Sequence, residues 1–134
     1  MSTEISKRTV VIDLDACLAD YDGWDVHGDF PGPPRVDVVS GLTKLKQKGF
    51  VIGILTTRNR ELVEKWIAKH GLNDLIDFVN DNPYQPEGCS HKPIAFCYID
   101  DRAVRYDGTN MGDIVDGIVS GALEPWYKRK PKVS

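Results

Sequence analysis

The stretch Val10-Val11-Ile12-Asp13-Leu14-Asp15 decides the fold. The run that begins at Thr9 is apolar and rich in β-branched residues, a pattern typical of a strand buried on both faces of a parallel sheet. It ends abruptly in two aspartates separated by a single leucine. We therefore predict a buried parallel strand over residues 9–13, with Asp13 and Asp15 at its carboxyl end.

Strand-like and helix-like segments alternate after this run. Residues 37–48 read as a helix with an Asp37 cap, and residues 60–69 read as a second helix that Asn59 caps, each followed by a glycine. A weaker helix is expected over 111–122. Further strands are expected over 50–55, 75–79 and 94–99. This alternation predicts an α/β fold: a three-layer, Rossmann-like parallel sheet with helices on both faces.

Length and composition narrow the class of protein. The chain has 134 residues, which predicts a single domain over 1–134. A net charge of -3 argues against nucleic-acid binding driven by bulk charge. Neither a long apolar run nor a signal-peptide pattern occurs, so we expect a cytoplasmic protein with no membrane partner. We expect a loop or flap over 20–34. A basic tail over 126–134 is interpreted as a solubilising segment or a nucleic-acid contact.

Polar residues follow three of the predicted strands. Asp13 and Asp15 follow the first, Thr56-Thr57-Arg58 follows the second, and Asp100-Asp101 follows the last. In a parallel sheet these carboxyl ends meet at one edge, where ligands bind. Two carboxylates about 4 Å apart repel by roughly 4 kcal/mol at an effective dielectric near 20. Clustered carboxylates therefore indicate a hard cation such as Mg²⁺, which commonly bridges to phosphate. The alternative is that each aspartate only caps a helix or forms a turn.

At these residues the sequence resembles the haloacid dehalogenase (HAD) superfamily of phosphohydrolases, in particular its small capless members from phages and bacteria. Four ordered motifs between Val10 and Arg105 carry the resemblance. They are an apolar run followed by Asp-x-Asp, a Thr that ends the second strand, an upstream Lys, and an acidic pair that closes the last strand. The two sites where the family inserts cap domains correspond here to short segments, about 20–34 and 80–92. The resemblance therefore implies a HAD-like domain without a cap.

The resemblance also implies roles for individual residues. Asp13 would be the nucleophile that forms an aspartyl-phosphate, and Asp15 the general acid and base. Thr56 would bind a phosphoryl oxygen, with Thr57 and Arg58 beside it, and Lys92 would offset the charge of Asp13 and the phosphate. Mg²⁺ would be held by Asp13, by the Asp15 backbone carbonyl, and by Asp100 or Asp101, of which Asp101 aligns with the usual ligand.

Two residues depart from the family pattern. Ala16 and Cys17 stand where the family usually has Gly followed by Thr or Val. Alanine disfavours a positive φ angle, and Cys17 is interpreted as a small packing residue. Lys92 lies seven residues before the end of the last strand, so it reaches the site only if the loop before that strand stays at the active edge and the strand is short. Arg58 is the alternative source of positive charge.

The predicted function is Mg²⁺-dependent hydrolysis of a phosphomonoester. Expected substrates are a phosphorylated small molecule or a nucleotide, nucleoside monophosphates first, and a nucleic-acid end is also compatible with an open site. A homo-oligomer, in which a partner subunit covers the site, is left open. One alternative is a receiver-like phosphoacceptor domain, although receivers carry their acidic pair on the first strand and their single Asp on a middle strand, the reverse of the order here. The other is a HAD-like binding domain without catalytic activity.

Overall fold

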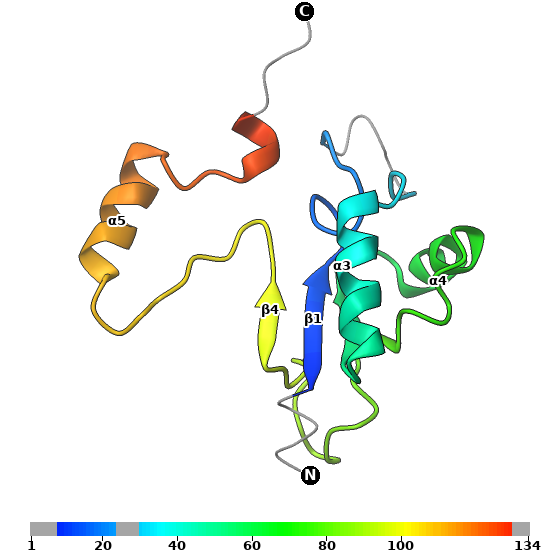
Figure 1. Cartoon of the computed structure of the whole chain (residues 1–134). Coiled ribbons are helices and arrows are strands. Elements are labelled where there is room, and N and C mark those ends of the chain that lie inside the picture. The colour runs from blue at the N-terminus through cyan, green and yellow to red at the C-terminus, as the bar shows by residue number, and fades with distance from the viewer. Residues whose placement is uncertain (1–7, 24–29, 130–134) are drawn as a thin grey trace, which may run out of the picture.

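A four-stranded, all-parallel sheet forms the centre of the protein. The computed structural model describes residues 8–23 and 30–129. The strands are β1 (Thr9–Asp13), β2 (Val51–Leu55), β3 (Phe78–Val79) and β4 (Cys97–Ile99), and their order in the sheet is β3-β2-β1-β4 (Figure 1). Asp13 is level with Leu55 of β2, and Ile12 is level with Ile99 of β4. The predicted α/β class and parallel sheet are confirmed.

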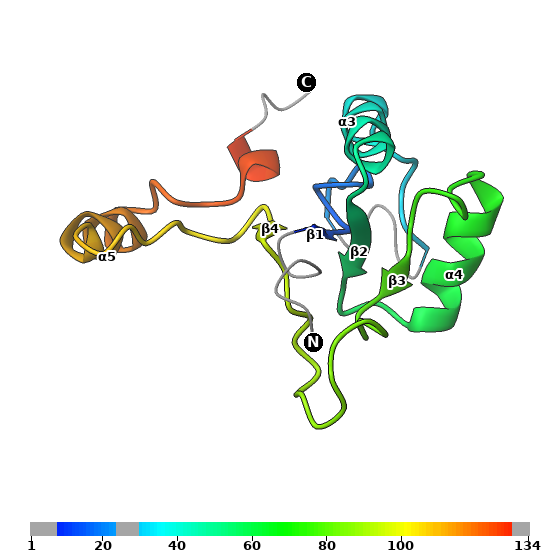
Figure 2. The same ribbon diagram turned by 60° about the horizontal axis from the view of Figure 1, so that its bottom comes forward.

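Two helices cover one face of this sheet. They are α3 (Val36–Gln47) and α4 (Arg60–Lys69). Their buried side chains form one core with the alternate residues of β1 and β2 that face them. The core includes Ile12, Ile54, Leu42, Val63 and Trp66. Figure 2 shows both helices on the same side of the sheet. Successive right-handed crossovers in one direction place their helices on one face, so α3 and α4 share a face instead of covering both.

Local sequence signals set most of the element boundaries. Asn59 caps α4, because its side chain accepts a hydrogen bond from the Leu62 amide. Gly71 then turns the chain with φ +68°. For α3 the expected cap is wrong: the cap position is Arg35, and Asp37 lies in the first turn. There its negative charge still favours the positive end of the helix dipole.

The two outer strands are shorter than the sequence predicts. The third was expected over 75–79 but comprises Phe78–Val79, because residues 73–75 form a turn after α4. The last was expected over 94–99 but comprises Cys97–Ile99. Segment 80–96 contains turns and no helix or strand. Neither edge strand has a neighbour on its outer side within the described residues, so only short pairings form there.

The chain leaves the sheet after β4 and forms an arm. An extended segment leads to α5 (Met111–Ser120), which stands apart from the sheet, and the chain then returns in the short helix η1 (Trp126–Arg129) (Figure 1). Helix α5 was predicted over 111–122. None of the helices in the described residues combines the length and apolar character that crossing a bilayer requires. The centre of the expected flap, 24–29, and the end of the basic tail, 130–134, lie outside the described residues.

Candidate functional site

A pocket of about 470 Å³ lies at the carboxyl edge of the sheet. It collects the residues that follow β1, β2 and β4. Its lining comprises Asp13, Asp15, Tyr21, Leu55, Thr56, Thr57, Arg58, Asp100, Asp101 and Arg102. The structure thus brings together seven of the eight side chains that the sequence singles out. Tyr21, Leu55 and Arg102 are additions, and none of them was singled out as a site residue.

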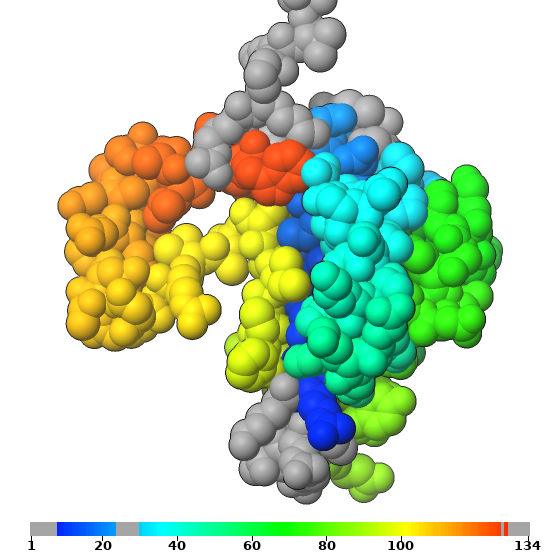
Figure 3. Space-filling view, viewed as in Figure 1, coloured from blue at the N-terminus to red at the C-terminus, as the bar shows by residue number. Residues whose placement is uncertain are grey.

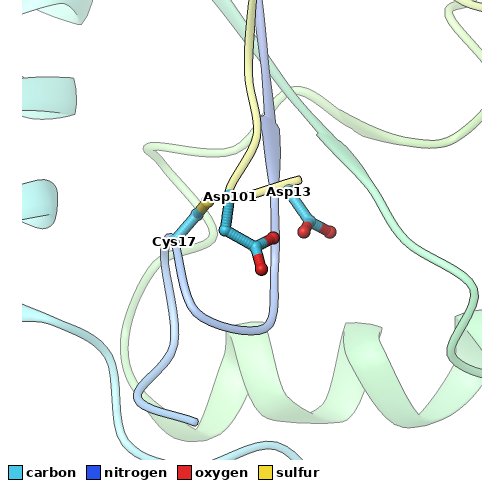
Figure 4. Close-up of side chains that lie close together, drawn as sticks. All are labelled: Asp13, Cys17 and Asp101. Atoms are coloured by element: carbon cyan, nitrogen blue, oxygen red, sulfur yellow. The ribbon is translucent and has the colours of Figure 1, made fainter. Parts of the chain in front are cut away.

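Two carboxylates meet at the base of this pocket. Asp13 ends β1 and Asp101 follows β4, and Figure 4 shows their side chains beside that of Cys17. One potential ligand atom from each of these three residues lies within 4.8 Å of the others. Asp100 is turned toward its own loop, because its Oδ1 accepts a hydrogen bond of 2.7 Å from the Arg102 amide. The geometry therefore favours Asp101 over Asp100 as the direct partner of Asp13.

This proximity changes the acidity of Asp13. The pKa of Asp13 is raised to about 8, first by burial and then by a hydrogen bond with Asp101 and by the charges of Asp100 and Asp101. The Leu14 amide opposes the shift, since it donates to Asp13 Oδ1 at 2.9 Å. Two carboxyl groups in such contact share a proton unless a cation replaces it. The cluster is therefore a place where positive charge is stabilised.

Cys17 is a packing residue in this environment. It is buried and belongs to the hydrophobic core. Burial, together with the nearby carboxylates Asp13, Asp101 and Asp100, raises the pKa of its thiol to about 12. A thiol is a poor nucleophile and a poor metal ligand until it loses its proton. Close to neutral pH the cluster therefore offers the oxygens of two carboxyl groups and no thiolate, which is a hard oxygen donor set.

Asp15 is paired with Arg58 above the cluster. Arg58 Nε donates to Asp15 Oδ2 at 2.7 Å, and the Arg58 side chain is only 2 % exposed. The other oxygen of Asp15 is buried and accepts no hydrogen bond within the described residues. A buried acceptor without a donor is unfavourable, so Oδ1 is suited to a hydrogen-bond donor supplied by a ligand. Arg58 thus orients Asp15 as well as lining the pocket.

Thr56 is held in place from two sides. Its amide donates to Asn80 Oδ1 at 2.9 Å, and its hydroxyl oxygen accepts from the Arg58 amide at 3.1 Å. A hydroxyl that accepts one bond still has its own proton to donate, so Thr56 can donate to an anionic oxygen in the pocket. Asn80 follows β3 with φ +62°, a conformation that asparagine tolerates better than most residues. Sequence reasoning missed Asn80, whose only signal was its position at a strand end.

The turn after β1 is anchored by the C-terminal arm. Ala16 has φ +68°, and its carbonyl accepts a hydrogen bond of 2.7 Å from the Trp126 indole. The Arg35 guanidinium lies over the Trp126 ring, 4.8 Å from its centre. The departure from glycine at position 16 is therefore accommodated with a left-handed alanine, which is strained. No local pattern in the sequence links Trp126 to a residue so distant along the chain.

Lys92 is the predicted site residue that the structure does not bring to the pocket. It lies five residues before β4, whereas the pocket lies beyond the other end of that strand. Its ammonium group lies over the Tyr98 ring at 5.2 Å, and the Tyr98 hydroxyl donates to the Pro93 carbonyl at 2.6 Å. Although β4 has only three residues, Lys92 lies beside Tyr98 in the middle of the strand and does not reach its carboxyl end. Arg58 is the buried cation that lines the pocket in its place.

Comparisons with known proteins support the fold and give no evidence on function. No family model matches the sequence, and no curated protein matches it. Among solved structures, the chain is similar to one described as a conserved protein from Bacteroides thetaiotaomicron. The two share 20% sequence identity, the TM-score is 0.59, and the match covers 94% of this chain and 99% of the other. A likeness at this identity shows a common fold, and function has to be argued from the site.

Proposed function

We propose that this chain is a Mg²⁺-dependent phosphohydrolase that acts through an aspartyl-phosphate on Asp13. The observation that carries the proposal is one pocket in which paired carboxylates lie beside groups that bind anions. Asp13 and Asp101 form the acidic part, and Thr56 and Arg58 form the part that attracts an anion. The resemblance of the ordered motifs to the HAD superfamily supports the same assignment.

The donor set fits the proposed metal. Asp13 and Asp101 supply carboxylate oxygens, the ligands that Mg²⁺ prefers, and Cys17 retains its proton. Asp13, Asp101 and the Asp15 backbone carbonyl would hold the ion, with Asp100 behind them. When bound, Mg²⁺ would neutralise the charge that the phosphoryl group and Asp13 bring together.

The proposed reaction takes two steps on the residues of this pocket. In the first, an oxygen of Asp13 forms a bond to phosphorus while the bond from phosphorus to the ester oxygen breaks, and Asp15 donates a proton to the departing alcohol. In the second, Asp15 takes a proton from water, and that water attacks phosphorus and releases phosphate and free Asp13. Thr56 donates a hydrogen bond to the phosphoryl oxygen, and Arg58 holds Asp15 in position.

The open edge of the sheet bears on the class of substrate. Segment 80–96 holds no domain that covers the pocket. A pocket of about 470 Å³ that the described residues leave open accommodates a phosphorylated metabolite or nucleotide, or the phosphorylated end of a larger molecule. Nucleoside monophosphates are our first choice, followed by nucleic-acid ends.

A substrate panel tests this proposal. Purified protein would be assayed with Mg²⁺ against p-nitrophenyl phosphate, nucleoside monophosphates, and oligonucleotides with a 5′- or 3′-phosphate. We expect turnover that EDTA abolishes and that Asp13→Asn reduces by at least about a thousandfold, as for other covalent nucleophiles. The matched control is Asp74→Asn, an exposed carboxylate after α4 that should leave the rate unchanged. Equal rates for wild type and Asp13→Asn, or phosphorylation without steady turnover, would reject hydrolysis at this site; the second result would indicate a phosphoacceptor domain.

A further inference from the structure

A tight turn that closes on itself carries Asp15, the proposed acid and base. The Ala19 amide donates to the Leu14 carbonyl at 2.8 Å, and the Ala16 amide donates to the Ala19 carbonyl at 3.0 Å. Between these bonds Ala16 has φ +68°, a left-handed conformation that strains an alanine. A strained residue keeps its conformation only where the surrounding structure fixes it. The placement of Asp15 therefore depends on what holds Ala16.

Trp126 holds Ala16 from outside the turn. Its indole Nε1 donates to the Ala16 carbonyl at 2.7 Å. Ala16 is only 2% exposed, and the carbonyl of a buried residue is unfavourable without a donor. The bond also selects one orientation of the peptide unit that follows Ala16, because a rotation of that unit would turn the carbonyl away from the indole. Trp126 thus acts on the same turn that carries Asp15.

Arg35 holds Trp126 in this position and ties it to the far end of the turn. The guanidinium lies over the indole ring, 4.8 Å from its centre, where a cation and an aromatic face attract each other. The Arg35 amide donates to the Leu18 carbonyl at 2.7 Å, and its side chain donates to Asp20 Oδ1 at 2.8 Å. Figure 3 shows the red surface of η1 against the cyan start of α3. Two parts of the segment 16–20 are therefore linked to one indole ring.

The C-terminal arm meets the body of the protein at Pro125 and Trp126. Among the described residues that follow β4, the first buried one is Pro125, and no residue of α5 is buried. The hydrophobic core lies among the sheet, α3 and α4, and it contains no described residue of the arm. Loss of the Trp126 hydrogen bond should therefore disturb the turn and leave the core intact.

We propose that Trp126 is a positioning residue of the phosphatase, which acts through the Ala16 carbonyl to hold the turn that places Asp15. This inference rests on the proposed function. Asp15 is then fixed at two levels, since Arg58 holds its side chain and the anchored turn holds its main chain. The second step of the proposed reaction needs Asp15 as a base for every substrate, whereas the first step needs it as an acid only when the leaving group is poor. Loss of the indole donor should therefore slow the second step most.

Rapid-mixing kinetics of the full chain with p-nitrophenyl phosphate and saturating Mg²⁺ separate the two steps. Trp126→Phe keeps an aromatic ring beside Arg35 and removes the N–H donor. We expect it to release the first equivalent of p-nitrophenol within about threefold of the wild-type rate and then to turn over at least about tenfold more slowly, since a small displacement of a catalytic group has a large effect on rate. Its kcat and KM should fall together. The control is Tyr106→Phe, an exposed aromatic residue of the same arm that loses only its hydroxyl and should leave both phases unchanged.

A second substitution tests whether the effect passes through the turn. Glycine adopts φ +68° without strain, so Ala16→Gly should restore the steady rate of Trp126→Phe to within about threefold of the wild type. Hydrogen exchange should be faster in Trp126→Phe at the amides of residues 16–19 and unchanged in β2.

The outcomes separate this inference from the proposed function. An active wild type with a Trp126→Phe variant of unchanged steady rate would overturn the inference alone. The same holds for a variant in which both phases are slowed equally, or one that Ala16→Gly does not restore. A wild type without turnover on any phosphoester would reject the proposed function, and this inference with it.

Discussion

Replacement of Asp13 by asparagine should stabilise the metal-free protein, and more so as the pH rises. The pKa of Asp13 in the folded protein is about 8, against 3.8 for an ordinary aspartate, because burial, Asp101 and Asp100 all disfavour its charge. A group whose pKa is raised on folding contributes stability that is fully present below its unfolded pKa and is lost as the pH rises through its folded pKa. The wild type should therefore lose stability between about pH 4 and pH 8.

The variant escapes this loss and keeps the local hydrogen bonds. An asparagine oxygen can accept from the Leu14 amide as Asp13 does, and its amide group can donate to Asp101. At about 1.36 kcal/mol per pKa unit the shift sets an upper limit near 6 kcal/mol. Asp13 is only half-buried and water screens part of the repulsion, so we expect about 2 kcal/mol at pH 8. For a domain of this size that is an increase in Tm of about 5–10 °C.

Thermal unfolding in EDTA between pH 4 and pH 8.5 measures this effect. The difference in Tm between Asp13→Asn and wild type should be near zero at pH 4, should rise with pH, and should level off above about pH 8. Mg²⁺ at pH 8 should raise the Tm of the wild type and leave that of Asp13→Asn nearly unchanged, since the cation binds the charged form. Asp74→Asn, on the surface, is the matched control. An Asp13→Asn protein that is no more stable than wild type at pH 8 would refute the idea that the carboxylates strain the metal-free site.

Four further substitutions test the surroundings of the site. Ala16→Gly should raise the free energy of unfolding by about 1 kcal/mol in urea titrations, because glycine adopts φ +68° without strain; a loss of stability would contradict the strained turn. Gly53→Ala should lower it by about 3 kcal/mol, since the new Cβ would overlap the buried Phe78 ring, and a change below about 0.5 kcal/mol would contradict that packing. In a phosphatase assay, Arg58→Met should reduce kcat/KM about a hundredfold or more, because Arg58 lines the pocket. Lys92→Met should reduce kcat/KM by less than about threefold, because Lys92 lies beside Tyr98. A larger loss for Lys92→Met than for Arg58→Met would show that Lys92 reaches the site.

The central part of the fold follows from short-range patterns. An apolar, β-branched run predicts β1, and the rule that carboxyl ends of parallel strands share one edge places Asp13, Thr56 and Asp101 in one pocket. Asn59 precedes an amphipathic segment, and this local pattern predicts the start of α4. Its side chain accepts a hydrogen bond from a backbone amide in the first turn of the helix. These features depend on residues that lie close together in the chain or on the topology of the sheet.

The features that were missed depend on tertiary contacts. The hydrogen bond between Thr56 and Asn80 joins residues 24 positions apart, and the one between Ala16 and Trp126 joins residues 110 positions apart. No periodic pattern in the sequence predicts either pair. The position of Lys92 depends on where β4 begins, and strand ends are the least certain boundaries in a sequence. The local sequence does not predict that α5 lies away from the rest of the protein. Its amphipathic pattern predicts a helix, but it does not say which surface the apolar face packs against.

The central claim is that Asp13 accepts the phosphoryl group, and trapping of the phosphorylated enzyme tests it most directly. Asp15→Asn removes the base that the second step needs, while p-nitrophenyl phosphate has a leaving group that departs without an acid. Asp15→Asn would be mixed with this substrate and Mg²⁺, quenched in acid, digested and mapped by mass spectrometry. The account predicts close to one phosphoryl group per chain, on the peptide that contains Asp13. A phosphoryl group on another residue, or an unlabelled variant beside an active wild type, would contradict it.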